Sequence, residues 1–462
     1  MGGPSRGVLV HDDGTEEIVA PASVMVDDFG ARLLLEYEYG PELLPSNAAS
    51  CEALSVAGMW RYSALLPIDE GPIAYPLPVG GTPLVAPAVL RARIGLPNLW
   101  LKDETRGPSG SNKDRATALV LQQAISSGVS RVTSASTGNV AVSLAVGAAA
   151  VGKEAVNFVP ADVDDGKLAL MRHVGATVVK VRGGYEAAFH LSRQAAREFS
   201  WIDRNTGVNP ATVEAKKTVA FEIWEQLGGE MPDVVAIPVG DGPTLNGIAK
   251  GFRELVACGV ASAVPQLVGV QADGCQPVKR AWEAGRRVEA TETHTIADGI
   301  GVSRPISGAL AVRDVVASAG FFVSVTDAQM LDAMGLLGAS AGVLAEPAGA
   351  ASLAGLLVAV REGRLAPHAR MVALVTGSAL KTPRFYQASG RVVEISADLD
   401  ELSRVLRSLD SRPRRSMSCR AMQFRRRREE SSEPSPCLLN DTRHLHAEAV
   451  VAGFVLEAGP GS

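Results

Sequence analysis

The sequence predicts an α/β fold built on open parallel sheets, and three observations support this class. From about residue 84 onward, short runs of β-branched residues alternate with helix-forming stretches, which is the pattern of βαβ units. Ala, Val, Leu and Gly are plentiful while only 5% of residues are aromatic, which suits helices packed closely on buried strands. With 462 residues, the chain is long enough for two lobes and terminal extensions.

The periodicity of the apolar residues places the individual elements. Strands are expected at residues 131–135, 155–159, 177–181, 234–238, 266–270 and 371–375, with an earlier one at 31–37. Helices are expected at residues 114–126, 139–151, 165–174, 185–199, 212–227 and 245–257. The helix at 139–151 is apolar on every side, so we expect it to be buried all round.

The composition also indicates how the chain is divided. Residues 1–55 show little periodicity and are interpreted as an N-terminal extension, followed by a main region at 56–409 whose smaller lobe covers roughly 115–205. Residues 410–462 contain arginine runs and a Ser/Pro-rich stretch, so we expect a disordered tail, with a phosphate- or membrane-binding arm as the alternative.

Charge and cysteine content exclude several classes of function. The net charge is −5 and the main basic cluster lies near the C-terminus, so no nucleic-acid partner is expected. The five cysteines are scattered without a Cys-x-x-Cys pair, which argues against a metal site and a disulfide framework and favours the cytoplasm. Without a signal peptide or a long apolar run, we expect a soluble protein with no membrane contact.

Lys113 is the first candidate for chemistry. Residues 102–115 read KDETRGPSGSNKDR, so this lysine follows a Gly/Pro/Ser loop and stands at the start of a helix. A cation there opposes the helix dipole, which suggests that its amine is needed near an anion or an electrophile; a structural lysine is the alternative. A Walker phosphate loop is excluded because it requires Gly-Lys-Ser/Thr.

Three further loops follow predicted strands. Hydroxyl and small residues before the helix at 139 could cradle an α-carboxylate, and they are Ser136, Thr137, Gly138 and Asn139. A glycine-containing loop could form a phosphate cup from Gly240, Asp241, Gly242, Pro243 and Thr244. Thr376 ends a late strand. Each loop alone could be an ordinary helix cap or turn, but all four signals lie where open parallel sheets bind ligands.

Eight ordered motifs carry a resemblance to a known family. They are WRY at 60–62, GGTPL at 80–84, LPNLWLKDE at 96–104, PSGSNKDR at 108–115, STGN at 136–139, TIADGI at 295–300, EPAGAAS at 346–352 and TGS at 376–378. In this order the chain resembles threonine synthase, in the tryptophan-synthase-β-like (fold type II) superfamily of enzymes that use pyridoxal 5'-phosphate (PLP). The resemblance covers roughly residues 55–405.

The resemblance implies two open parallel-sheet lobes with PLP in the cleft between them. Lys113 would hold PLP as a Schiff base and move the α-proton, Asn139 would bond its 3'-oxygen, and residues 240–244 would hold its phosphate. Thr376 would meet the pyridine nitrogen. Because a neutral hydroxyl does not keep that nitrogen protonated, elimination or replacement is expected in preference to transamination. The expected partners are a small amino-acid substrate and a second copy in a homodimer.

Five positions depart from the threonine synthase pattern. Asn112, Val140, Gly207, Thr212 and Thr244 stand where these enzymes commonly have Phe, Thr, Ser, Arg and Asn. Such residues contribute to gripping the phosphate of O-phosphohomoserine, so we expect the lyase chemistry to be kept and the substrate to differ. True threonine synthase, serine/threonine dehydratase and a PLP-binding regulatory protein without turnover remain the alternatives.

Lys216 and Lys217 could compensate for the lost phosphate contacts, because they follow Thr212 by about one helical turn. A pair of lysines on a helix is more often part of a solvated face. We therefore expect both side chains in solvent and place neither in the site.

Overall fold

The computed structural model describes residues 3–20, 31–45, 55–69, 71–136, 138–161, 163, 165–386, 390 and 392–410. The chain divides into two compact units, Met1–Ala388 and Ser389–Ser462. The described part of the second unit contains helix α13 (Leu399–Asp410), on which Leu399 and Leu406 are exposed. Residues 411–462, which hold nearly all of the predicted disordered tail, lie outside the described residues.

The larger sheet of the first unit has six strands in the order β12-β11-β10-β13-β5-β4. Their bounds are β4 (Leu84–Val85), β5 (Leu99–Asp103), β10 (Val234–Pro238), β11 (Gln266–Ala272), β12 (Phe321–Val325) and β13 (Met371–Val375). All neighbouring strands run parallel except β4 and β5. This arrangement confirms the predicted α/β class.

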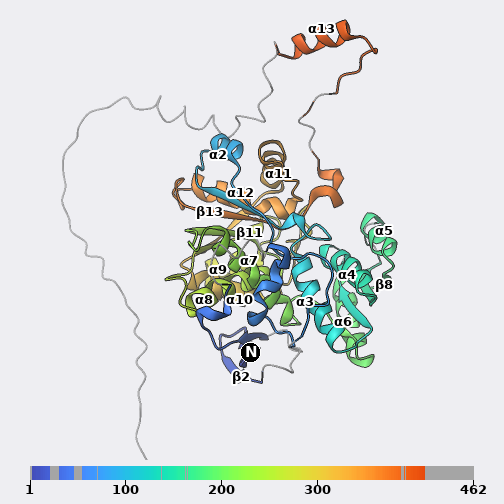
Figure 1. Cartoon of the computed structure of the whole chain (residues 1–462), viewed down its shortest axis with the longest axis vertical. Coiled ribbons are helices and arrows are strands. Elements are labelled where there is room, and N and C mark those ends of the chain that lie inside the picture. Colours follow the sequence, from blue (N-terminus) through green and yellow to red (C-terminus); the bar gives the residue numbers. More distant parts are fainter. Residues whose placement is uncertain are drawn as a thin grey trace, which may run out of the picture. The chain divides into compact units, whose positions relative to one another are not determined.

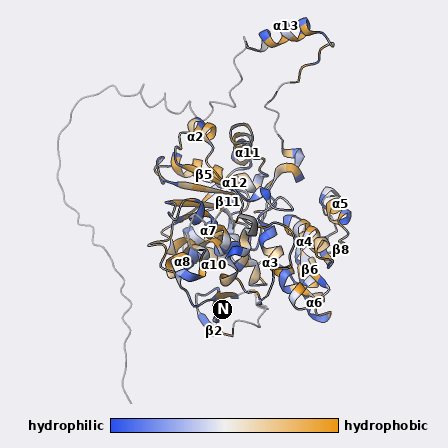
Figure 2. Cartoon of the chain, viewed as in Figure 1, coloured by the Kyte–Doolittle hydropathy of each residue, from blue (hydrophilic) through white to orange (hydrophobic). Residues whose placement is uncertain are grey.

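Helices cover both faces of this sheet. Successive residues of a strand point to opposite faces, so neighbouring residues of β10 pack with different helices. Val234 and Ala236 pack with α2 (Ala88–Ile94), α11 (Asp327–Ala341) and α12 (Pro347–Arg361). Val235 and Ile237 pack with the helices of the other face, namely α7 (Ala211–Gln226), α8 (Pro243–Ala257), α9 (Pro277–Ala284) and α10 (Gly308–Ala317). Both faces of β10 are therefore apolar, and all five of its residues are buried. Figure 2 shows the hydropathy of each residue along the ribbon.

The smaller sheet is fully parallel, with strand order β8-β7-β6-β9. Its strands are β6 (Arg131–Ala135), β7 (Glu154–Pro160), β8 (Thr177–Val181) and β9 (Ile202–Asp203). The helices of this lobe are α3 (Lys113–Ser126), α4 (Asn139–Ala150), α5 (Asp165–His173) and α6 (Gly184–Glu198), and Figure 1 shows them grouped on one side of the unit. The middle of α4 is buried as predicted, whereas Ala149 and Ala150 at its end are exposed.

The N-terminal residues form a third, antiparallel sheet of β1 (Arg6–His11), β2 (Glu16–Val19) and β3 (Ala31–Glu36). The strand predicted at 31–37 is β3, while β1 and β2 were not predicted. Leu34 of β3 packs with Val213 of α7 and Leu310 of α10, so this sheet covers helices of the larger lobe. Short 3-10 helices complete the unit, namely η1 (Pro41–Leu43), η3 (Ser55–Leu65), η4 (Glu104–Arg106), η5 (Ala379–Lys381) and η6 (Pro383–Phe385).

Candidate active site

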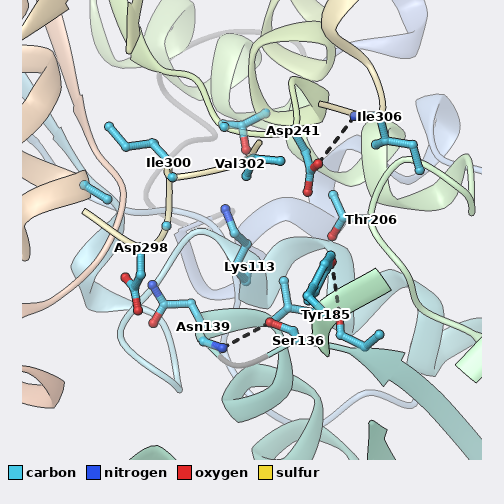
Figure 3. A pocket seen from close by; sticks show the side chains of 18 of the residues that line it. Lys113, Ser136, Asn139, Tyr185, Thr206, Asp241, Asp298, Ile300, Val302 and Ile306 are labelled. Atoms are coloured by element: carbon cyan, nitrogen blue, oxygen red, sulfur yellow. Dashed lines mark hydrogen bonds between the residues drawn. The ribbon is translucent and has the colours of Figure 1, made fainter. Parts of the chain in front are cut away.

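A cavity of about 830 Å³ lies at the carboxyl ends of strands from both parallel sheets. It is lined by ten of the residues predicted from the sequence, namely Lys113, Ser136, Gly138, Asn139, Gly240, Asp241, Gly242, Pro243, Thr244 and Thr376. Thr137 lies outside the described residues. Figure 3 shows Lys113 in the middle of the cavity, with Asn139 on one side of it and Asp241 on another. The structure thus brings the predicted residues together, and their binding roles remain predictions.

Lys113 is the first residue of α3, and its neighbour Asn112 connects it to two other parts of the cavity. Lys113 Nζ donates to Asn112 Oδ1 at 3.0 Å, and Asn112 Nδ2 donates to Thr244 Oγ1 at 3.3 Å. The backbone N–H of Asn112 donates to the carbonyl of Thr376 at 2.9 Å. Asn112 therefore links the amine to the glycine loop and to the end of β13.

The surroundings of Lys113 raise the share of its neutral amine above that of an ordinary lysine. Burial, and then the Arg204 guanidinium, lower the pKa of Lys113 to about 8, while the carboxylates of Glu346 and Asp241 act in the opposite direction. Arg204 is itself fully buried and donates to the carbonyl of Lys113 at 3.2 Å. A lysine with a pKa near neutrality can act both as a nucleophile and as a proton carrier.

The loop from Gly240 to Thr244 has a shape that only glycines allow. Gly242 has φ +100°, and a Cβ there would lie 2.6 Å from the carbonyl oxygen of Ser307. A Cβ on Gly240 would lie 3.0 Å from the carbonyl oxygen of Gly299. Because α8 starts at Pro243, the positive end of this helix adjoins the loop, which is the arrangement of an anion site.

Asn139 and Glu346 form a pair on another wall of the cavity. Asn139 Nδ2 donates to Glu346 Oε1 at 2.7 Å, and burial raises the pKa of the Glu346 carboxyl. Glu346 is only 4% exposed and stands directly before α12. The motif at 346–352 was recognised in the sequence, but no role was predicted for this glutamate. One signal in the sequence could have identified this glutamate. It directly precedes Pro-Ala-Gly, a sequence that is typical of the start of a helix.

Two more charged contacts at the cavity were not predicted. Lys167 of α5 forms an ion pair with Asp298, so a side chain of the smaller lobe meets the 295–301 loop beside the larger sheet. Lys381 donates to the carbonyls of Ser109 at 2.8 Å and Gly110 at 3.1 Å, next to the Lys113 loop. Both pairs join segments far apart in the sequence, which no local pattern could indicate.

The predicted solvent exposure of Lys216 and Lys217 is wrong. Lys216 is 1% exposed and Lys217 is fully buried, because α8 and the N-terminal sheet cover α7. Lys217 Nζ forms ion pairs with Glu214 at 2.7 Å and Glu254 at 2.9 Å. Lys216 Nζ has no hydrogen-bond partner among the described residues.

Metal binding and membrane insertion would each require a specific feature in the described part of the chain. No group of three or more His, Cys, Asp or Glu side chains there is placed to hold a metal ion. No helix there has the length and apolar character needed to cross a bilayer.

Comparison with known proteins places this cavity in context. The family described as pyridoxal-phosphate dependent enzyme matches residues 75–377. Threonine synthase from Methanocaldococcus jannaschii is 35% identical over 356 residues, covering 76% of this chain and 88% of that protein. Threonine synthase from Mycobacterium bovis is 36% identical over 323 residues, with 70% and 88% covered. Diaminopropionate ammonia lyase from Escherichia coli has a similar fold, with a TM-score of 0.57, 20% identity, and 66% and 86% covered.

Proposed function

Since this chain belongs to the family of pyridoxal-phosphate dependent enzymes, we propose that its cavity holds PLP on Lys113 and acts on a small O-activated or hydroxylated amino acid. The chain is a threonine synthase-like lyase, and its reaction class is elimination or β/γ-replacement. One observation carries the assignment of Lys113: its amine, with a pKa of about 8, lies in a cavity beside a glycine loop and the start of α8.

The residues of the cavity fit this cofactor. There is no room for a side chain at Gly240 or at Gly242. Without side chains at these two positions, the backbone of the loop can approach a phosphate closely. Asn139 lines the cavity with an amide suited to a phenolic oxygen, and Thr376, directly after β13, has a hydroxyl suited to a ring nitrogen. We propose these residues as the cofactor contacts, together with Asp241, Pro243 and Thr244.

The chemistry divides between the cofactor and the chain. When bound, PLP withdraws electrons from the α-carbon of the substrate and makes its proton acidic. Lys113 is then the base that takes this proton, because burial and Arg204 keep its pKa low enough for a neutral amine near physiological pH. Ser136, Gly138 and the first turn of α4 would orient the α-carboxylate, in a loop that the hydrogen bond from Gly138 N–H to Ser136 Oγ at 3.1 Å stiffens.

The neutral hydroxyl of Thr376 supports elimination or replacement over transamination. A carboxylate facing the ring nitrogen would stabilise its protonated form and prolong negative charge at the α-carbon. Glu346 also lines the cavity, but its carboxylate accepts the hydrogen bond of Asn139. Loss of the β- or γ-leaving group is therefore the favoured outcome.

The structure supports a substrate other than O-phosphohomoserine. Thr212 Oγ1 accepts from the N–H of Gly207 at 3.1 Å and donates to the carbonyl of Asn209 at 2.7 Å, so its hydroxyl is used within the chain. Val140 lines the cavity with an apolar side chain. Serine or threonine dehydration is the second candidate, and conversion of O-phosphohomoserine to threonine is the third.

We also propose a cytoplasmic homodimer. Cys258 and Cys275 are buried with free thiols, which suits a reducing compartment. Light scattering on the purified protein would determine its oligomeric state.

Replacing Lys113 by alanine tests the proposed function. The purified wild-type protein should show a visible absorption band, and Lys113→Ala should lose the band and reduce turnover by about 10³-fold or more. Lys180→Ala, which removes an exposed lysine of β8, is the matched control and should change neither. Full activity of folded Lys113→Ala protein would refute the proposal.

A further inference from the structure

Lys216 is a buried lysine for which the described residues offer no hydrogen-bond acceptor. Its side chain is 1% exposed, and its Nζ makes no hydrogen bond. A buried ammonium without a partner is costly, because it has lost its hydration and gained nothing in return. Such a group in a folded protein calls for a ligand that would pair with it.

The packing of α7 on α8 directs this ammonium toward the glycine loop. A Cβ on Gly247 of α8 would lie 2.8 Å from Lys216 Cβ, so the two helices touch at this level. At their beginnings, a Cβ on Gly207 would lie 3.3 Å from Cγ of Pro243, the first residue of α8. Side chains on a helix lean toward its N-terminus, so Lys216 extends back toward the starts of both helices.

The electrostatic neighbours of Lys216 agree with this direction. They are Lys113, Arg204 and Asp241, and all three belong to the cavity or its wall. Burial and the two cations hold the pKa of Lys216 well below its usual value, while Asp241 acts in the opposite direction. Three basic side chains are therefore near enough to act on one another, and one of them, Lys113, lines the same cavity as the start of α8, which together favour an anion of high charge.

We propose that Lys216 is the buried counter-cation of a phosphate monoester dianion seated on the loop Gly240–Thr244. The proposal rests on the proposed function, since the cofactor carries such a group. A phosphorylated amino-acid substrate is the other source of the same chemistry.

Lys217 provides a matched control on the same helix. It is equally buried, but its ammonium is paired with Glu214 and Glu254. Lys217→Met should therefore lower the Tm of the apoprotein, whereas Lys216→Met should leave it unchanged or raise it, because it removes a charge that has no partner.

Cofactor binding to the apoprotein is the first arm of the test. PLP and pyridoxal, which lacks the phosphate, are titrated by absorbance into wild type, Lys216→Met and Lys217→Met. Lys216→Met should raise the Kd of PLP about 10- to 100-fold, as expected for the loss of one charge-assisted contact, and leave that of pyridoxal unchanged. Lys217→Met should keep the wild-type ratio of the two constants.

The second arm compares O-phosphohomoserine with homoserine binding to the PLP-loaded variants. A loss confined to O-phosphohomoserine would identify the phosphate of the substrate as the partner of Lys216. Wild-type affinities of folded Lys216→Met for PLP and O-phosphohomoserine alike would overturn the proposal.

Inorganic phosphate separates this proposal from the proposed function, because it requires no cofactor. It should raise the Tm of wild-type apoprotein and have little effect on that of Lys216→Met. Equal increases in both proteins would overturn the role of Lys216, whereas failure of the wild type to bind PLP would refute the proposed function alone.

Discussion

Two regions of buried charge lie close to Lys113, and they differ in whether the charges are paired. In the first, Lys102 Nζ contacts Glu222 at 2.7 Å, and Arg115 contacts both Glu104 at 2.7 Å and Glu222 at 2.6 Å. In the second, at the cavity, Arg204 donates only to neutral oxygens in its hydrogen bonds with described residues, and Lys216 has no acceptor there. Carboxylates contact the basic groups directly in the first region, whereas in the second they act on Arg204 and Lys216 only without direct contact.

This difference separates charges that build the fold from charges that serve a ligand. The paired region, defined by Lys102, Glu104, Arg115 and Glu222, joins β5, α3 and α7, and so fixes the start of α3 where Lys113 stands. Its hydrogen bonds satisfy both carboxylates within the protein. In the cavity region, Lys216 has no acceptor among the described residues and Arg204 bonds only neutral oxygens there, an arrangement that costs stability and would suit an anionic ligand.

Breaking the paired region should have the largest effect on stability. Glu222→Gln leaves Lys102 and Arg115 with one carboxylate fewer, and removing one partner from a buried pair typically costs about 3–5 kcal/mol. The free energy of unfolding, measured with urea, should fall by this amount. The pKa of Glu222 is held well below its usual range, mainly by Arg115 and Lys102 against burial, so its stabilisation should be complete at neutral pH and lost only under strongly acidic conditions.

An exposed ion pair supplies the control for this prediction. Arg131 and Glu154 are in contact at 2.6 Å, but their side chains are 47% and 40% exposed. Glu154→Gln should change the free energy of unfolding by less than about 1 kcal/mol. If Glu222→Gln were equally mild, the paired region would not hold the site in place.

The second prediction concerns the substrate phosphate. By the resemblance to threonine synthase, Thr212 replaces an arginine and Val140 replaces a hydroxyl residue, so we expect two contacts worth about 1.5–3 kcal/mol each to be missing. Turnover of O-phosphohomoserine should then show a kcat/KM lower by about a hundredfold or more than in an enzyme with both contacts. The rate of phosphate release from O-phosphohomoserine gives this kcat/KM, and the rate of ammonia release from serine and threonine gives the values for comparison.

Val140→Thr sharpens this prediction, because the side chain lines the cavity and has nearly the same volume as threonine. Restoring the hydroxyl should raise kcat/KM for O-phosphohomoserine about tenfold and leave that for serine unchanged. Efficient conversion of O-phosphohomoserine to threonine by the wild type would contradict the prediction. The protein would then be assigned threonine synthase activity.

The regular part of the fold was predictable because it depends on local patterns. The expected strands 177–181, 234–238 and 371–375 match β8, β10 and β13 residue for residue. Lys113 and the glycine loop could be located because strand, loop and helix follow each other along the chain. The strand β2 was missed because it has only four residues and is mostly exposed, and β1 was missed because its apolar run, residues 8–10, is only three residues long.

The charges around the site could not be predicted, because their partners are distant in sequence. Lys216 and Lys217 are adjacent and look alike, and only the packing of α8 and the N-terminal sheet decides that both are buried. Glu254, which pairs with Lys217, lies 37 residues away from it. A sequence pattern reports which face of a helix is apolar, but it does not report which polar residue will be covered.

The third prediction uses the pKa of Lys113. At pH 7 a lysine with a pKa of about 8 is roughly one-tenth neutral, whereas an ordinary lysine is neutral in fewer than about one molecule in a thousand. The rate at which the apoprotein captures PLP, followed by stopped-flow absorbance, should rise with pH and level off above about 8. A midpoint near that of a free lysine would contradict the assigned surroundings.

Glu346→Gln tests the direction of this effect. The Glu346 carboxylate raises the pKa of Lys113, as Asp241 does, while Arg204 and Lys381 lower it. Removing this negative charge should move the midpoint to lower pH, and glutamine can still accept the hydrogen bond from Asn139. A midpoint that moves upward would mean that Glu346 does not act on Lys113 through its charge.

The smallest expected effect concerns Thr376, whose side chain is 8% exposed at the end of β13. Its carbonyl accepts from the N–H of Asn112, and this backbone contact does not depend on the side chain, so Thr376→Asp should retain PLP. An aspartate would place a carboxylate at the ring nitrogen and prolong negative charge at the α-carbon, so the share of transamination in the products should rise several-fold. Thr376→Asn, of the same size and neutral, should keep the wild-type ratio of keto acid to elimination product, as measured by chromatography. An unchanged ratio in a PLP-loaded Thr376→Asp protein would mean that this hydroxyl does not face the ring nitrogen.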